Sequence, residues 1–200
     1  MVERLASSSN RAVPRTLVVT VVACAIALLA GCSDSSDPSG PQFIVCESTY
    51  ALCTTAPCTP LADAPGFAAC SCSVQTDYSA ALDPCQEVQD TGADQVVYSR
   101  YHPITSYALC SNDRPWTMCL DSPCTIDKND PSVATCVCTE MVNQGDYIVV
   151  SADGQYSPSS CTTGYWSAAT VVDVTQVTDY LATHDTPLKP LPIDVYLGAQ

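Results

Sequence analysis

The sequence predicts a small, disulfide-rich, mainly β protein that consists of two tandem cysteine-rich repeats and one helix near the C-terminus. Twelve of the fourteen cysteines, an even number, lie between residues 43 and 200, and their spacing recurs along the chain. The apolar segments between them are short and rich in β-branched and aromatic residues, which favour strands. A cysteine density of this kind is typical of folds that disulfides stabilise.

The chain begins with a segment typical of a secretory signal. An apolar stretch from Leu17 to Leu29 contains no charge, follows three arginines and ends in small residues. Thirteen helical residues span only about 20 Å, and the hydrocarbon core of a membrane is about 30 Å thick. A permanent transmembrane helix is therefore not favoured, and we expect a signal peptide over residues 1–31.

Leu29-Ala30-Gly31-Cys32, at the end of this stretch, resembles the lipobox of bacterial lipoproteins. The resemblance implies that the chain is cleaved before Cys32, that the Cys32 thiol carries diacylglycerol and that the new amine is acylated, for example with palmitate. It also implies an extracytoplasmic, lipid-anchored protein, with Ser33 favouring the outer membrane if the organism is Gram-negative. The alternative is an ordinary signal peptide that is cleaved nearby, in which case Cys32 is one more cysteine.

Residues 32–42 predict a lipidated tether, because the stretch from Ser33 to Pro41 contains turn-forming residues and no large apolar one. Ten residues of such coil span roughly 17 Å. After removal of the signal, four basic and twenty acidic residues remain, a net charge of −16. This charge repels nucleic acid and anionic lipid head groups. We therefore expect no nucleic-acid partner, and a membrane contact through the lipid alone.

The repeat is defined by six cysteines in each copy. The first copy, residues 43–98, contains Cys46, Cys53, Cys58, Cys70, Cys72 and Cys85, and the second, residues 99–200, contains Cys110, Cys119, Cys124, Cys136, Cys138 and Cys161. The four inner cysteines match at a constant offset of 66 residues, within the frames C-x2-[AS]-P-C-T and A-x-C-x-C. The last gap is ten residues longer in the second copy. Each copy is too small to fold on a hydrophobic core alone.

Strand geometry predicts how the cysteines pair. Cys70 and Cys72 are two residues apart, so in a strand they point to one face with Cα atoms about 7 Å apart, too far for a bond between them. Each is expected to reach a different partner in the turn between Cys53 and Cys58, in an order that the sequence leaves open. Cys46 then pairs with Cys85. By the repeat, Cys119 and Cys124 pair with Cys136 and Cys138, and Cys110 pairs with Cys161.

Zinc is the competing use of the same sulfurs, because four thiolates in two close pairs form a tetrahedral site. The pairs here are C-x4-C and C-x-C instead of the usual C-x2-C, and an exported protein meets oxidising conditions. No C-x-x-C redox motif occurs. The acidic loop Asp127–Pro131 is a candidate calcium ligand, but it lacks the glycine and glutamate of an EF-hand. We expect solvated turns there, and no metal or other cofactor.

Four further segments have a predicted structure. Residues 94–104 and 147–150 favour strands, the latter as half of a hairpin with residues 155–156 inside the ten-residue insertion. Residues 170–183 predict a helix whose apolar stripe covers the second repeat. Prolines then interrupt the chain before a last edge strand at 193–197.

Catalytic motifs are absent from the sequence, which has two histidines, no H-E-x-x-H, no G-x-S-x-G and no glycine-rich phosphate loop. One cluster of aromatic and basic residues is a possible binding surface: Tyr98, Arg100, Tyr101 and His102. The alternative, which we favour, is a connecting strand whose rings pack between the repeats. Trp116 and Trp166 are likewise expected in the core.

The sequence alone favours a membrane-anchored interaction module with a protein or glycan partner. The alternatives are a structural envelope lipoprotein without a discrete ligand and, less favoured, an enzyme or a metal-binding protein. An enzyme would use His102 or His184 with a nearby carboxylate.

Overall fold

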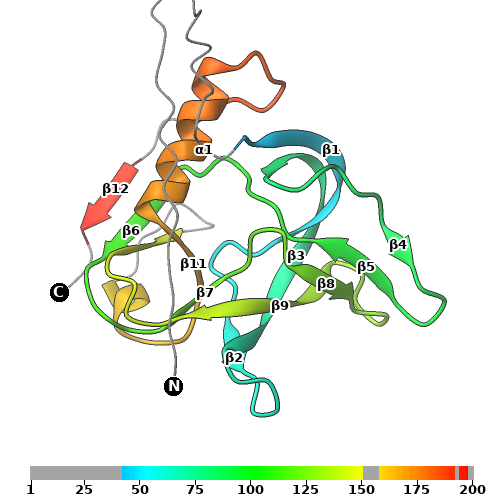
Figure 1. Ribbon diagram of the computed structural model, residues 1–200, viewed down its shortest axis with the longest axis horizontal. Coiled ribbons are helices and arrows are strands. Elements are labelled where there is room, and N and C mark those ends of the chain that lie inside the picture. Colours follow the sequence, from blue (N-terminus) through cyan, green and yellow to red (C-terminus); the bar gives the residue numbers. More distant parts are fainter. Residues whose placement is uncertain (1–41, 151–157, 192–193, 198–200) are drawn as a thin grey trace, which may run out of the picture. The chain divides into compact units, whose positions relative to one another are not determined.

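The computed structural model describes residues 42–150, 158–191 and 194–197 (Figure 1). The strands that precede residue 99 are β1 (Ile44–Leu52), β2 (Cys58–Pro60), β3 (Phe67–Ala81), β4 (Gln89–Asp90) and β5 (Gln95–Tyr98). The later elements are β6 (Ser106–Cys110), β7 (Trp116–Met118), β8 (Pro123–Ile126), β9 (Val133–Met141), β10 (Tyr147–Val150), the 3-10 helix η1 (Pro158–Cys161), β11 (Ser167–Thr170), α1 (Val171–Thr183) and β12 (Asp194–Leu197). The predicted class, a small disulfide-rich and mainly β fold, is confirmed.

The two repeats join through their central strands. β3 pairs with β9 antiparallel over seven residues, and Cys70 lies opposite Cys136. These two cysteines are equivalent in the repeat, since they differ by 66 positions. An antiparallel pair centred on equivalent residues relates the two repeats by an approximate twofold axis, so each repeat presents the same surface to the other.

Each repeat also builds the same hairpin around its central strand. Cys58 lies opposite Cys70 in the β2–β3 pair, and Cys124 lies opposite Cys136 in the β8–β9 pair. β1 pairs with β3 along nine residues. In the second repeat the corresponding ladder is divided into two parts with one common register, β7–β9 and β6–β10. The strand predicted at 147–150 therefore continues the repeated hairpin, whereas residues 155–156 lie outside the described residues.

The chain that follows the sixth cysteine of each repeat forms backbone hydrogen bonds with the other repeat. β5 runs antiparallel to β8, and Ser99 N donates to Ser122 O at 2.9 Å. In the same way the start of β11 and the residue Tyr165 before it lie along the turn that leads into β2. Ser167 N donates to Ala56 O at 3.0 Å, and Cys58 N donates to Tyr165 O at 2.8 Å. β5 thus pairs with the second repeat, and the start of β11 bonds to the first, so that the strands of both repeats belong to one sheet.

The C-terminal helix occupies the predicted position. Thr170 caps α1, with its side chain accepting from Asp173 N and the Asp173 carboxylate accepting from Thr170 N. Its buried Leu181 packs in one cluster with Phe43 and Ala80. Phe43 and Ala80 belong to the first repeat, and Leu120 of the same cluster belongs to the second, so the helix covers the second repeat as predicted and the first as well. Within the described residues, no helix combines the length and the apolar character needed to cross a membrane.

The last strand, β12, pairs in parallel with β6 and, among the described strands, with no other, so it is an edge strand as predicted. The lipobox residues and the tether as far as Pro41 lie outside the described residues.

Candidate functional site

All twelve cysteines of the repeats form disulfides, in the pairs that strand geometry predicted. The bonds join Cys46–Cys85, Cys53–Cys72, Cys58–Cys70, Cys110–Cys161, Cys119–Cys138 and Cys124–Cys136. The sequence left open which cysteine of each turn pairs with which cysteine of the strand. In both repeats the first cysteine of the turn pairs with the second cysteine of the strand, and the second of the turn pairs with the first of the strand. No bond crosses from one repeat to the other.

The inner disulfides of both repeats meet in the middle of the molecule. Cys53 Sγ lies 3.4 Å from Cys136 Sγ, and the sulfurs of Cys53, Cys119 and Cys138 lie within 4.8 Å of one another. Three or more sulfurs so close resemble a metal site, but a sulfur in a disulfide is not a thiolate ligand. These sulfurs therefore form a core that both repeats share, and they provide no site for chemistry with solvent.

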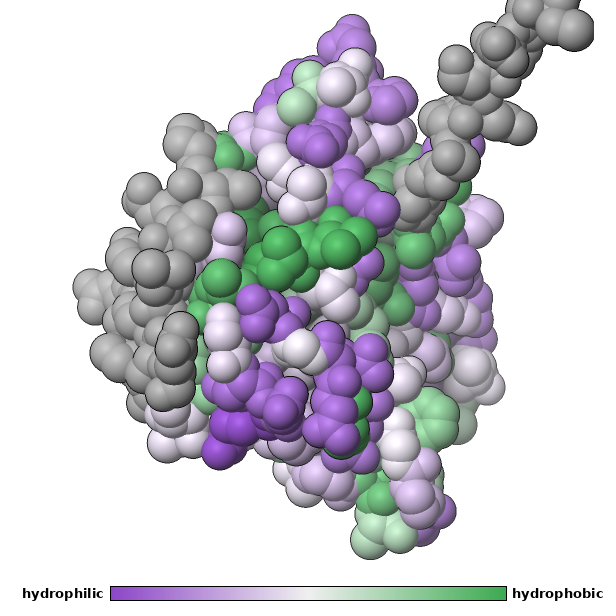
Figure 2. All heavy atoms as spheres, turned by 60° about the vertical axis from the view of Figure 1, so that its left-hand side comes forward, coloured by the Kyte–Doolittle hydropathy of each residue, from purple (hydrophilic) through white to green (hydrophobic). Residues whose placement is uncertain are grey.

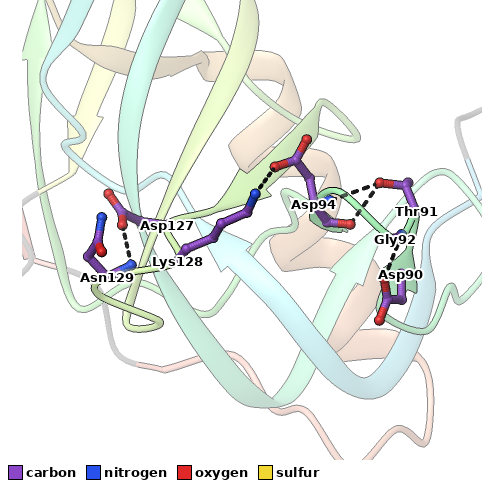
Figure 3. A network of polar contacts seen from close by, with 7 residues as sticks. All are labelled: Asp90, Thr91, Gly92, Asp94, Asp127, Lys128 and Asn129. Carbon is purple, nitrogen blue, oxygen red and sulfur yellow. Dashed lines mark hydrogen bonds and ion pairs between the residues drawn. The ribbon is translucent and has the colours of Figure 1, made fainter.

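The acidic loop considered as a calcium ligand uses its carboxylates locally (Figure 3). Asp127 accepts from the backbone N–H groups of Asn129 and Asp130, at 2.7 and 3.2 Å. Lys128 Nζ lies 3.2 Å from the Asp94 carboxylate in the loop that joins β4 and β5. Such contacts are those of solvated turns, and this exposed ion pair is worth at most about 1 kcal/mol.

Arg100 of the aromatic and basic cluster is buried, with 5 % of its surface exposed. Its guanidinium donates to Ser79 Oγ at 3.0 Å, to Ile44 O at 3.1 Å and to Cys46 Sγ at 3.0 Å. Burial lowers the pKa of this guanidinium, and the carboxylates of Asp121 and Asp83 oppose the shift. Arg100 thus ties β1 to β3.

The aromatic residues of this cluster pack between elements of both repeats. Tyr101 lies beside Phe43, with ring centroids 6.5 Å apart, and its hydroxyl donates to Met118 Sδ at 3.7 Å. Burial and then the carboxylates of Asp173 and Asp121 raise the pKa of Tyr101. Tyr98 pairs with Pro123 in the β5–β8 ladder.

The two tryptophans differ in burial. Trp116 is 1 % exposed and stacks on Tyr147, with ring centroids 5.8 Å apart. Trp166 is half-buried, and its Nε1 donates to Thr163 O at 2.7 Å. Trp116 therefore cannot serve as a flat platform for a ligand.

The two histidines contact carbonyl, hydroxyl and aromatic groups. His102 Nδ1 lies 3.2 Å from Tyr78 O and 3.3 Å from the Tyr50 hydroxyl. His184 is exposed at the end of α1 and stacks on Tyr180 at 4.1 Å. In the part of the chain that the structure describes, neither imidazole lies within 4.0 Å of a carboxylate.

The strongest candidate site is an apolar cavity of about 80 Å³ beneath α1. The helix supplies Val174, Val177 and Leu181, and the segment after it supplies Leu188 and Leu191. Other lining residues come from the connection after β5 and from the turns of both repeats: Thr54, Thr55, Arg100, Tyr101, His102, Pro103, Ile104 and Leu120. Figure 2 shows one face of the molecule, on which hydrophobic side chains form a band between hydrophilic areas.

Three of the four residues singled out in the sequence, Arg100, Tyr101 and His102, thus line the cavity, and Tyr98 does not. Sequence reasoning did not find the cavity itself. The signal that was available is Leu188-Lys189-Pro190-Leu191, in which two leucines lie close to a proline that interrupts regular structure. Such a segment packs only if another surface covers its leucines.

Chemically, the cavity is suited to an apolar group. No carboxylate is present among its described lining residues, and its polar groups are hydroxyls, one imidazole and one guanidinium. Its volume is well below the roughly 300–1,000 Å³ of pockets that enclose whole small-molecule ligands. A single aliphatic side chain is a better match in size. Comparison of the chain with protein-family models, with curated proteins and with solved structures finds no match.

Proposed function

We propose that this protein is a lipid-anchored, extracytoplasmic binding module, which holds a protein partner by an apolar side chain in the cavity beneath α1. The apolar cavity is the observation that carries this proposal. The wall that Leu181 and Leu188 form is buried, whereas Leu191 at the rim is 43 % exposed. Burying one leucine-sized side chain contributes about 1.5–3 kcal/mol.

The cavity favours a protein over a glycan. Sugars need several convergent hydrogen-bonding groups and an exposed aromatic face, and the described lining is mostly aliphatic. Trp116 is enclosed in the core. A side chain such as leucine needs no hydrogen bond and matches the lining.

The charge of the chain indicates what surrounds that side chain. The exported chain has twenty acidic and four basic residues, and one of the four, Arg100, is buried. Such a surface attracts basic segments and speeds their association. The partner we propose is therefore a basic segment with a central aliphatic residue.

Three synthetic peptides test this function on the exported, lipid-free chain that begins at Ser33: a basic peptide with a central leucine, the same peptide with serine, and an acidic peptide with leucine. We expect the basic leucine peptide to bind at least about tenfold more tightly than the serine peptide, because of the buried area. The acidic peptide should bind most weakly. The difference in affinity between the acidic and the basic leucine peptides should decrease as the salt concentration rises.

Two matched variants locate the site. Leu191→Asp places a charge at the rim of the cavity, and Leu82→Asp does the same at a leucine of nearly equal exposure, 42 %, that does not line it. Leu191→Asp should abolish the preference for leucine, and Leu82→Asp should preserve it. Equal effects of the two variants, or no preference in the parent chain, would leave a structural envelope lipoprotein as the better account.

The lipid anchor has its own test. Metabolic labelling with a palmitate analogue should mark the parent chain and a Cys24→Ser variant, because Cys24 lies within the apolar stretch upstream of the cleavage point. Cys32→Ser should remove the label. Labelling that survives Cys32→Ser would contradict the lipobox.

A further inference from the structure

One of the six disulfides differs from the others in its surroundings. Cys85 is the one cysteine of the twelve that is exposed, whereas its partner Cys46 is 3 % exposed. The equivalent bond of the second repeat joins Cys110 and Cys161, which are both fully buried. In thiol–disulfide exchange a thiolate attacks one sulfur while the other sulfur leaves. In the Cys46–Cys85 bond the sulfur open to attack is that of the exposed Cys85, and the leaving sulfur is that of the buried Cys46.

The Cys46 sulfur faces a cation. Arg100 Nη2 lies 3.0 Å from Cys46 Sγ, and the same guanidinium is fixed by Ser79 Oγ and by the Ile44 carbonyl. Among the described residues, no carboxylate lies within 4.0 Å of this guanidinium. Its charge is therefore available to a thiolate at Cys46. A thiolate that is stabilised in this way is a better leaving group.

We propose that Cys46–Cys85 is a thiol-reactive site, which a dithiol reductant opens while the other five disulfides remain closed. The reductant's thiolate bonds to Cys85 Sγ, the Cys46–Cys85 bond breaks, and its electron pair stays on Cys46 as a thiolate beside Arg100. The second thiol of the reductant gives up its proton to solvent and attacks its own partner sulfur, which releases Cys85 as a thiolate that takes up a proton. The reductant becomes a disulfide, and the protein gains two electrons.

Reduction of the Cys46–Cys85 bond affects the segment that follows β3. Cys85 connects the segment after β3 to β1. That segment is also held by hydrogen bonds from Leu82 N and Asp83 N to the Asp121 carboxylate and from Arg100 to Asp83 O, and by the packing of Val88. The remaining disulfides, including the sulfur core, lie elsewhere. Reduction therefore frees residues around Cys85 and leaves the core intact.

Limited reduction tests the site on the exported chain. The chain is treated with a small amount of dithiothreitol, the free thiols are trapped with N-ethylmaleimide, and the labelled peptides are identified by mass. We expect Cys46 and Cys85 to be labelled at least about tenfold faster than Cys110 and Cys161, since access controls exchange. Earlier labelling of another pair, the half-buried Cys58 with Cys70 included, or proportional labelling of all six pairs, would overturn the proposal.

The role of Arg100 is tested by the pH dependence of alkylation after selective reduction. The rate of alkylation of each cysteine should rise with pH as its thiol ionises. For Cys85 we expect the midpoint of this rise near the ordinary value of about pH 8.5, and for Cys46 at least about one pH unit lower. The charged groups that face the guanidinium are Asp83 and Asp121, so the measured difference is the net effect of all three. Arg100→Met should remove the difference. If that variant does not fold, equal midpoints in the parent chain still exclude the role of Arg100.

Discussion

At the level of single residues, both repeats place a residue with a side chain in a backbone conformation that favours glycine. Thr55 has φ 51° and Asp121 has φ 57°, and they are equivalent positions of the C-x2-[AS]-P-C turn. The turns are closed by Ala56 N donating to Cys53 O and by Ser122 N donating to Cys119 O. Asp tolerates this region better than Thr, whose branched Cβ crowds the backbone.

Thr55→Asn should therefore stabilise the protein, by about 1 kcal/mol, because asparagine adopts positive φ more readily. The free energy of unfolding in guanidinium chloride, followed by circular dichroism, measures the effect. Thr54→Asn is the matched control, since Thr54 has no positive φ, and it should not stabilise. A loss of stability in both variants would mean that the turn imposes no strain on Thr55.

The burial of Tyr50 makes the stability of the fold depend on pH. It is 1 % exposed, and burial followed by the Asp77 carboxylate raises its pKa to about 12. The folded pKa lies above the unfolded value of 10.0, so the folded state keeps the proton longer. This contribution to stability is complete below pH 10 and is lost as the pH rises from 10 towards 12.

Tyr50→Phe should cost about 1 kcal/mol at neutral pH, because the contact with His102 is lost. Above pH 10 the difference from the parent chain should shrink, since phenylalanine has no proton to lose. Unfolding curves at pH 8, 10 and 11 measure this trend. A difference that stays constant up to pH 11 would show that Tyr50 ionises as readily in the folded state as in the unfolded one.

At the level of elements, the capping box decides where α1 begins. The helix contains many β-branched residues, which form helices poorly, so its stability depends on the Thr170 cap and on the packing of Leu181. Thr170→Ala should cost about 1 kcal/mol and weaken peptide binding in the cavity. Thr175→Ala is the control, because the exposed Thr175 hydroxyl bonds back to Val171 O and alanine forms helix better.

Elements fixed by local chemistry were predictable, and those fixed by distant pairing were not. The alternation of Cys70 and Cys72 with exposed Ser71 gave the strand face and the disulfides. The helix followed from the spacing of its apolar residues. The contact between the start of β11 and the first repeat could not be predicted, because the hydrogen bond from Ser167 N to Ala56 O joins residues more than a hundred positions apart and leaves no local pattern.

At the level of the whole molecule, the two repeats share one core. The sulfur of Cys53 in the first repeat touches that of Cys136 in the second, β5 pairs with β8, and the start of β11 bonds to the turn before β2. Neither repeat can lose its structure without exposing apolar surface and unpaired backbone groups of its partner. We therefore expect the described unit to unfold in one transition.

The positions of the tryptophans allow a direct test, since Trp116 and Trp166 both belong to the second repeat. The double variant Cys46→Ala/Cys85→Ala removes a disulfide of the first repeat, with a sequence separation of 39 residues. The chain-entropy model predicts a loss of about 4 kcal/mol. If the repeats unfold together, tryptophan fluorescence and circular dichroism must give coincident transitions that shift by the same amount. Cys110→Ala/Cys161→Ala removes the equivalent disulfide of the second repeat, which has a separation of 51 residues. It should shift both transitions by a similar amount. Fluorescence that kept the parent midpoint in the first variant would show that the second repeat is stable alone, and the shared sulfur core would then carry little of the coupling between the repeats.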